Sequence, residues 1–132
     1  MSITATGTFD ISLAPGPTEL GGAISRFEFT KTFKGDLDGS STGVMLSAGD
    51  PQRGAAGYVA VETVRGKLGD RDGSFAFQQF GTVLGGAQTV HYEVVPGSGE
   101  GGLNGITGRL RLTIDDDGTH HYELEYDLSP PE

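Results

Sequence analysis

Apolar and polar residues alternate along most of this chain, which is the pattern of strands that bury one face. In the cleanest run, residues 3–13, the odd positions are apolar or glycine and the even positions are Thr, Ser or Asp. Glycine, proline or aspartate follows most of the runs, so we expect strands separated by turns. The other runs cover residues 23–33, a segment after Gly35-Asp36 that ends at Leu46, and residues 88–95, 109–114 and 122–127.

The stretch from Gly57 to Gly86 predicts two longer strands joined by a turn over residues 69–73. Unlike the other strands, these two carry bulky apolar or ionisable groups on both faces. We therefore expect this hairpin to lie at the centre of the fold, with one face toward a core or cavity. The other face would meet a partner subunit or a covering segment. The pattern does not decide which face is interior, because Val59, Val61 and Thr63 oppose the row of Tyr58, Ala60, Glu62 and Val64.

These runs give eight strands, and no segment shows a convincing helical period. We predict a single all-β domain over residues 1–132, an eight-stranded antiparallel β-barrel. Closure into a barrel removes exposed sheet edges, and the interior of eight strands either fills with side chains or holds one small ligand. We further expect a two-residue turn of the primed type at Asp117-Gly118 and an irregular ordered loop over residues 96–105.

Composition narrows the class of partner. Nine basic residues against eighteen acidic ones give a net charge of -9, so nucleic acid is not an expected partner. There is no cysteine, which excludes disulfides and thiolate chemistry. The polar start of the chain lacks the features of a signal peptide, and no apolar run approaches the roughly 20 residues that span a bilayer. We expect a soluble, cytoplasmic protein with no membrane partner.

Two motifs suggest cofactor or metal sites, but neither has the context it needs. Residues 97–102 satisfy the pattern G-x-G-x-x-G, yet no helix follows to hold a pyrophosphate, and Glu100 would repel it. The acidic turn at residues 115–118 lacks the alternating ligands of a calcium loop, while His120 and His121 point to opposite faces of a strand. We expect neither a cofactor nor a metal.

Glu62 is the candidate catalytic residue, because a carboxyl group inside a largely apolar barrel has a raised pKa and suits proton transfer. Gln79 and Tyr58 are further catalytic candidates, and Gln79, Tyr58 or Tyr92 would act as hydrogen-bond partners. The alternative left open is that Glu62 faces outward or is neutralised by a nearby lysine or arginine. Lys31 is one such cation, although its place in a row of phenylalanines also fits a side chain that reaches the rim or follows a bulge.

Aromatic side chains would line the ligand cavity, although core packing also explains most of them. The chain has no tryptophan and places several small residues in the inner rows, so the interior has room for a ligand. The candidate ligand-binding residues are Phe27, Phe29, Phe75, Phe77, Tyr92 and Tyr126.

Six stretches of this chain match a known family, and they are residues 34–40, 57–62, 66–68, 73–78, 94–99 and 103–108. Through them the chain resembles the bacterial domain-of-unknown-function family 3224. The stretches that carry the resemblance occur in the same order between residues 34 and 108, and this chain has Gln79 where the family usually has histidine. The resemblance implies a barrel like those of allene oxide cyclases and dirigent proteins, which bind small apolar molecules without a cofactor and often associate through the barrel wall.

We therefore expect a protein that binds a small apolar molecule inside its barrel. A cofactor-independent cyclase or isomerase is one form of this function, and a homo-oligomer through the barrel wall is a further expectation. Two alternatives stay open from the sequence: a carrier without chemistry, and a structural interaction module with a solid core.

Overall fold

The computed structural model describes residues 2–17 and 22–128 of the chain. Most of them lie in strands, and they include no helix long and apolar enough to span a membrane. Cytoplasmic location stays a prediction. The elements are β1 (Ile3–Pro15), β2 (Ile24–Gly35), β3 (Leu37–Asp50), the single-turn helix η1 (Pro51–Arg53), β4 (Ala55–Leu68), β5 (Arg71–Leu84), β6 (Ala87–Val94), β7 (Glu100–Gly101), β8 (Thr107–Ile114) and β9 (His120–Asp127).

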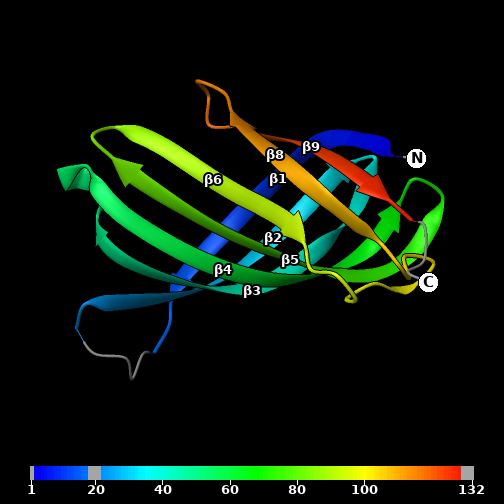
Figure 1. The fold of residues 1–132 in the computed structure, drawn as a ribbon, viewed down its shortest axis with the longest axis horizontal. Coiled ribbons are helices and arrows are strands. Elements are labelled where there is room, and N and C mark those ends of the chain that lie inside the picture. Colours follow the sequence, from blue (N-terminus) through cyan, green and yellow to red (C-terminus); the bar gives the residue numbers. More distant parts are fainter. Residues whose placement is uncertain (1, 18–21, 129–132) are drawn as a thin grey trace.

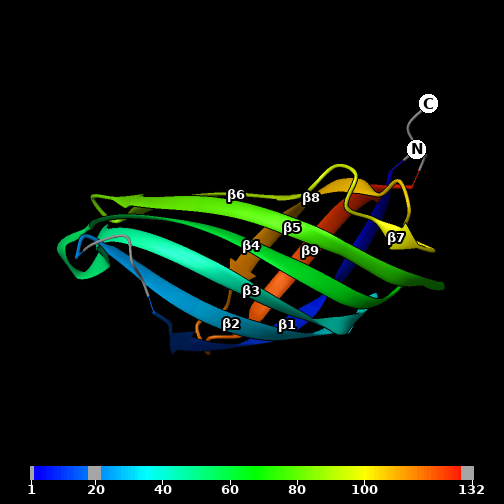
Figure 2. The ribbon, with the colours of Figure 1, turned by 90° about the horizontal axis from the view of Figure 1, so that it is seen from below.

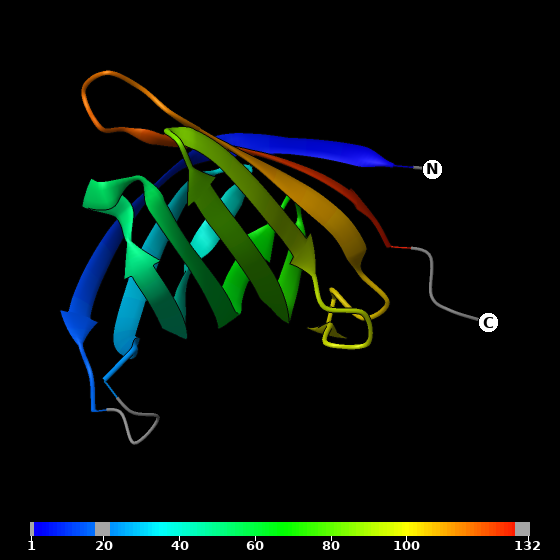
Figure 3. The same ribbon diagram turned by 60° about the vertical axis from the view of Figure 1, so that its left-hand side comes forward.

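Eight of the strands close into one antiparallel barrel, which confirms the predicted fold class (Figures 1 and 3). Around the ring the order is β1, β2, β3, β4, β5, β6, β8 and β9, and β9 pairs again with β1. The remaining strand, β7, lies outside the ring in the glycine-rich loop that we expected to be irregular, and it pairs with the start of β5. The β6–β8 contact is the weakest, since only Glu93 and Arg109 are in register there.

The β4–β5 hairpin presents its even-numbered β4 positions and odd-numbered β5 positions to the interior. Ala60, Glu62 and Phe77 are buried there, which resolves the ambiguity of the sequence pattern. The opposite face is exposed: Val59, Val61 and Phe80 remain 54%, 57% and 50% exposed. An apolar patch of this kind is typical of an interaction surface. A partner subunit on this face stays a prediction.

One end of the barrel is packed solid and the other is open. The loop that contains β7 lies at the end where β1 begins and β9 ends (Figure 2), and its Leu103 and Ile106 are fully buried in the core. The amide of Ile106 donates to the carbonyl of Leu103 at 3.1 Å, so residues 103–106 form a hydrogen-bonded turn. The packed half also contains Phe33, Leu37, Val64, Leu68, Phe75, Phe77, Val94 and Leu124.

The turn between β8 and β9 differs from its prediction. A two-residue primed turn at Asp117-Gly118 needs a positive φ at Asp117, and no described residue other than glycine has one. The loop instead spans residues 115–119, and the Gly118 amide donates to the Asp115 carbonyl at 2.9 Å. The Asp117 carboxylate accepts from the Thr119 amide at 3.0 Å, which favours this longer loop.

All four tyrosines of the chain have pKa values above the usual 10.0, mainly because burial disfavours the phenolate. At a pH between the pKa values of the unfolded and the folded state, the tyrosines of the folded protein keep their hydroxyl protons, whereas those of the unfolded chain release them. The stability from these groups is therefore present below pH 10 and is lost as the pH rises further.

We expect phenolate absorbance to stay low near pH 10 and then to rise together with loss of the β-sheet circular dichroism signal. The absence of tryptophan makes this absorbance specific for tyrosine. A tyrosine that ionises near pH 10 in a protein whose circular dichroism is still native would contradict the expectation.

Candidate functional site

A buried ion pair lies midway along the barrel interior. The Lys31 ammonium on β2 donates to Glu62 Oε1 on β4 at 2.8 Å, and the two residues are only 4% and 2% exposed. Ser41, on the intervening strand β3, donates its hydroxyl to Glu62 Oε2 at 2.6 Å. Gly43 makes room for this arrangement, since a Cβ at that position would lie 2.7 Å from the Glu62 Cβ.

Tyr92 on β6 completes the cluster from the far wall. Its hydroxyl donates to Glu62 Oε1 at 2.6 Å and accepts from the Lys31 Nζ at 2.7 Å. The Lys31 Nζ also lies 4.8, 5.1 and 5.0 Å from the ring centres of Phe9, Phe29 and Tyr92, within the range of cation–π attraction. Among the described residues, no buried side-chain nitrogen or oxygen lacks a hydrogen-bond partner. Each polar side chain of the cluster thus has at least one hydrogen-bond partner without a ligand.

Burial changes the proton affinities of this cluster. Desolvation lowers the pKa of Lys31 below 10.5, although the Glu62 carboxylate offsets part of the shift. Desolvation, together with the same carboxylate, raises the pKa of Tyr92 well above 10.0. Lys31 therefore gives up its proton more readily than an exposed lysine, and Tyr92 remains a hydrogen-bond donor at any ordinary pH.

Above the cluster, toward the open end, lies a pocket of about 150 Å³. Lys31 and Tyr92 line it, and Leu13, which is 48% exposed, lies at its outer rim. Tyr58 and Gln79 form a polar pair on one wall, where the Tyr58 hydroxyl donates to Gln79 Oε1 at 2.8 Å. The apolar part of the wall comes from Phe9, Ile11, Phe29, Met45, Ala60 and Leu112.

The structure brings together four of the residues singled out from the sequence, since Phe29, Tyr58, Gln79 and Tyr92 all line this pocket. Glu62 lies behind Lys31 and Tyr92, and does not line it.

The other four aromatic residues lie elsewhere. Phe75 and Phe77 belong to the packed half, Tyr126 lies in the same core near the packed end, and Phe27 is half-buried on β2. None of these four lines the pocket.

Eight of the twelve residues that line the pocket were not among the predicted site residues, and they include Lys31, His120 and Leu112. Lys31 carried a signal, because it interrupts the inner row of phenylalanines on its strand, and a buried cation needs a buried anion. Pairing with Glu62 was one of three alternatives for it. The sequence pattern does not distinguish Leu112 and His120 as pocket residues, because each lies on a strand with ordinary alternation of apolar and polar positions.

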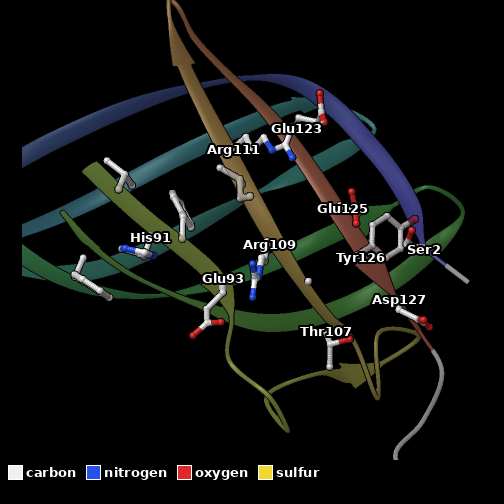
Figure 4. Close-up of a pocket in the computed structure, with 15 residues that line it drawn as sticks. Ser2, His91, Glu93, Thr107, Arg109, Arg111, Glu123, Glu125, Tyr126 and Asp127 are labelled. Atoms are coloured by element: carbon white, nitrogen blue, oxygen red, sulfur yellow. Dashed lines mark ion pairs between the residues drawn. The ribbon is translucent and has the colours of Figure 1, made fainter. Parts of the chain in front are cut away.

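A second, larger depression of about 740 Å³ follows the seam between β6 and β8 on the barrel wall (Figure 4). Charged side chains of both signs line it, including Glu93, Arg109, Arg111 and Glu123. Arg111 and Glu123 approach to 3.9 Å but are 82% and 50% exposed, so their attraction is weak. In the described part of the chain, no three His, Asp or Glu residues lie close enough together to hold a metal ion.

Comparison with known proteins gives one family. The family described as "Protein of unknown function (DUF3224)" matches residues 5–126. A crystal structure of a DUF3224 protein of unknown function from Shewanella oneidensis MR-1 is similar to this chain, with 41% sequence identity and a TM-score of 0.90. The match covers 99% of this chain and all of the other. No curated protein matches.

Proposed function

The chain belongs to the DUF3224 family of proteins of unknown function, and we propose that it binds a small, largely apolar molecule with one oxygen acceptor. The observation that carries the proposal is the pocket at the open end, whose walls are mostly apolar and whose floor holds an ammonium group. Such a combination of apolar walls and a few polar groups is typical of small-molecule sites.

The size of the pocket limits the ligand. A dry, apolar cavity of about 150 Å³ holds one benzene ring, and this pocket has the same volume. The expected ligand is therefore about one six-membered ring, with any longer substituent leaving through the rim near Leu13. A polycyclic or long-chain lipid would not fit without movement of the walls.

The polar floor favours a neutral oxygen. An ammonium group has three N–H donors, and two of those on Lys31 already bond Glu62 and Tyr92. The third is left for an acceptor in the pocket. Because the Glu62 carboxylate lies 2.8 Å from the same nitrogen, a ligand carboxylate would meet a nearby negative charge. A carbonyl or hydroxyl oxygen avoids that repulsion.

Cyclohexanone is a suitable probe, since it is one ring with one carbonyl. We expect saturation-transfer NMR to show that it binds, and that Ala60→Leu abolishes binding because the longer side chain fills the pocket. Val59→Leu is the matched control, since its neighbouring side chain points outward and is 54% exposed. Benzoate of similar size should bind more weakly. Equal binding to both variants would contradict the pocket assignment.

A cofactor-independent cyclase or isomerase is the second candidate function, in keeping with the allene oxide cyclase-like and dirigent-like barrel that the sequence resemblance implies. The supporting observation is that Tyr92 and Lys31 connect the pocket to the buried Glu62 carboxylate through hydrogen bonds of 2.6 and 2.8 Å. Such an enzyme would polarise the carbonyl and move a proton, whereas a carrier would only bind.

The same NMR sample in heavy water distinguishes the two. An enzyme should exchange the hydrogens next to the cyclohexanone carbonyl for deuterium, and Glu62→Gln should stop the exchange while binding survives. Binding without exchange above the buffer rate would favour the carrier.

A further inference from the structure

The amine of Lys31 has an unusual position among the lysines of this chain. The chain contains three lysines, and Lys34 and Lys67 are exposed on the barrel surface. Lys31 alone lines the pocket, where it is 4% exposed and surrounded by three aromatic rings. A primary amine in such a place can act as a nucleophile, because a desolvated lysine carries its proton less firmly.

Glu62 and Tyr92 are positioned to handle the proton of that amine. The ammonium already donates to Glu62 Oε1 at 2.8 Å, so proton transfer along this bond would convert the ion pair into a neutral amine and a carboxylic acid. The Tyr92 hydroxyl bonds both partners, at 2.7 and 2.6 Å, and can pass a proton between them and a bound ligand.

From this geometry we propose that Lys31 forms a reversible imine with a small aldehyde or ketone bound in the pocket. The inference rests on the proposed function and names its ligand class as carbonyl compounds. The nitrogen lone pair forms a bond to the carbonyl carbon, and the former carbonyl oxygen receives the proton held by Glu62. The nitrogen then gives a proton back to Glu62, and transfer of that proton to the hydroxyl lets it leave as water while the nitrogen lone pair forms the C=N bond. The balance is amine plus carbonyl to imine plus water, with no oxidant or reductant.

Reductive trapping tests the proposal on the intact protein. Benzaldehyde is added with sodium cyanoborohydride, which reduces an imine to a stable benzylamine. Each modified lysine then gains the mass of benzaldehyde less one oxygen atom, and peptide mapping identifies the site. Lys34 and Lys67 serve as internal standards within the same molecule. We expect Lys31 to be labelled at least about tenfold faster than either, because a bound aldehyde has a high effective concentration at its amine.

The pocket variants sharpen the test. Ala60→Leu should reduce labelling of Lys31 to the level of the exposed lysines or below and leave Lys34 unchanged, while Val59→Leu should behave like the original protein. Labelling of Lys31 that persists in Ala60→Leu would mean that the aldehyde reaches the amine by another path, and would overturn the proposal.

The two proposals fail in different ways. If Lys34 and Lys67 are labelled and Lys31 is not, while cyclohexanone still binds, the imine is refuted and the binding function stands. If Lys31 is not labelled and cyclohexanone also fails to bind, the binding function itself is refuted. If solvent exposure alone decided the labelling rate, the buried Lys31 would react more slowly than Lys34 and Lys67. The proposal predicts the opposite order of rates.

Discussion

Replacement of Lys31 by methionine is expected to lower the free energy of unfolding by about 3–5 kcal/mol. Methionine fills a similar volume, so the loss comes from the Glu62 carboxylate, which would remain buried at 2% exposure without its cation. Urea denaturation, followed by circular dichroism, measures the change as a lower midpoint with an unchanged slope.

The double variant Lys31→Met with Glu62→Gln is the control for this prediction. Glutamine keeps an oxygen that accepts from Tyr92 and a polar group that bonds Ser41, but it carries no charge. We expect the double variant to recover about half or more of the stability lost in Lys31→Met, because no uncompensated charge remains. A double variant that is less stable by the sum of both single losses would show that the two residues do not interact energetically.

Replacement of Phe77 alone by alanine is expected to lower the free energy of unfolding by about 3–5 kcal/mol, because it leaves a cavity in a fully packed site. Phe77 is 0% exposed, and its ring meets Phe75 and Tyr92 edge-on with ring centres 4.9 Å apart in each case. The surrounding strands are held in a closed ring and cannot collapse into the cavity. Urea denaturation again provides the measurement.

Phe80→Ala is a matched control on the same strand. Phe80 lies three residues along β5 on the outer face, is 50% exposed, and stacks on His91. Surface substitutions of this kind usually change stability by no more than about 0.5 kcal/mol. Similar losses in the two variants would contradict the assignment of the inner and outer faces of β5.

The barrel could be predicted because alternation is a local property of the chain. In the second strand, three phenylalanines on one face identify the buried side without any knowledge of its neighbours, and the structure buries Phe29 and Phe33 accordingly. The closure of the ring followed from the number of strands and from the cost of leaving sheet edges unpaired.

The site could be predicted only in part, because it depends on contacts between distant strands. Lys31 and Glu62 are 31 residues apart, and their pairing depends on the register of β2, β3 and β4, which alternation does not determine. The inner face of the β4–β5 hairpin was ambiguous because both faces carry apolar residues.

The division between packed and open halves was also hidden from the sequence. It depends on Leu103 and Ile106, which lie in a glycine-rich loop where no periodicity identifies a buried residue. Phe75 and Phe77 are therefore core residues beneath the pocket, although they share an inner row with Gln79, which lines it.

The single registered pair between β6 and β8 has a consequence for how fast a bound molecule is exchanged. Tyr92 lies on β6 and Leu112 on β8, on either side of the strand contact with the fewest registered pairs in the barrel. The strands at the chain ends, β1 and β9, are joined by seven registered pairs, so the ring is weakest away from its termini. Separation of β6 from β8 would open the pocket sideways while the other ladders stay intact. A bound molecule would then have a second exit besides the open end, and exchange through it would follow the opening of these two strands and not the global unfolding of the barrel.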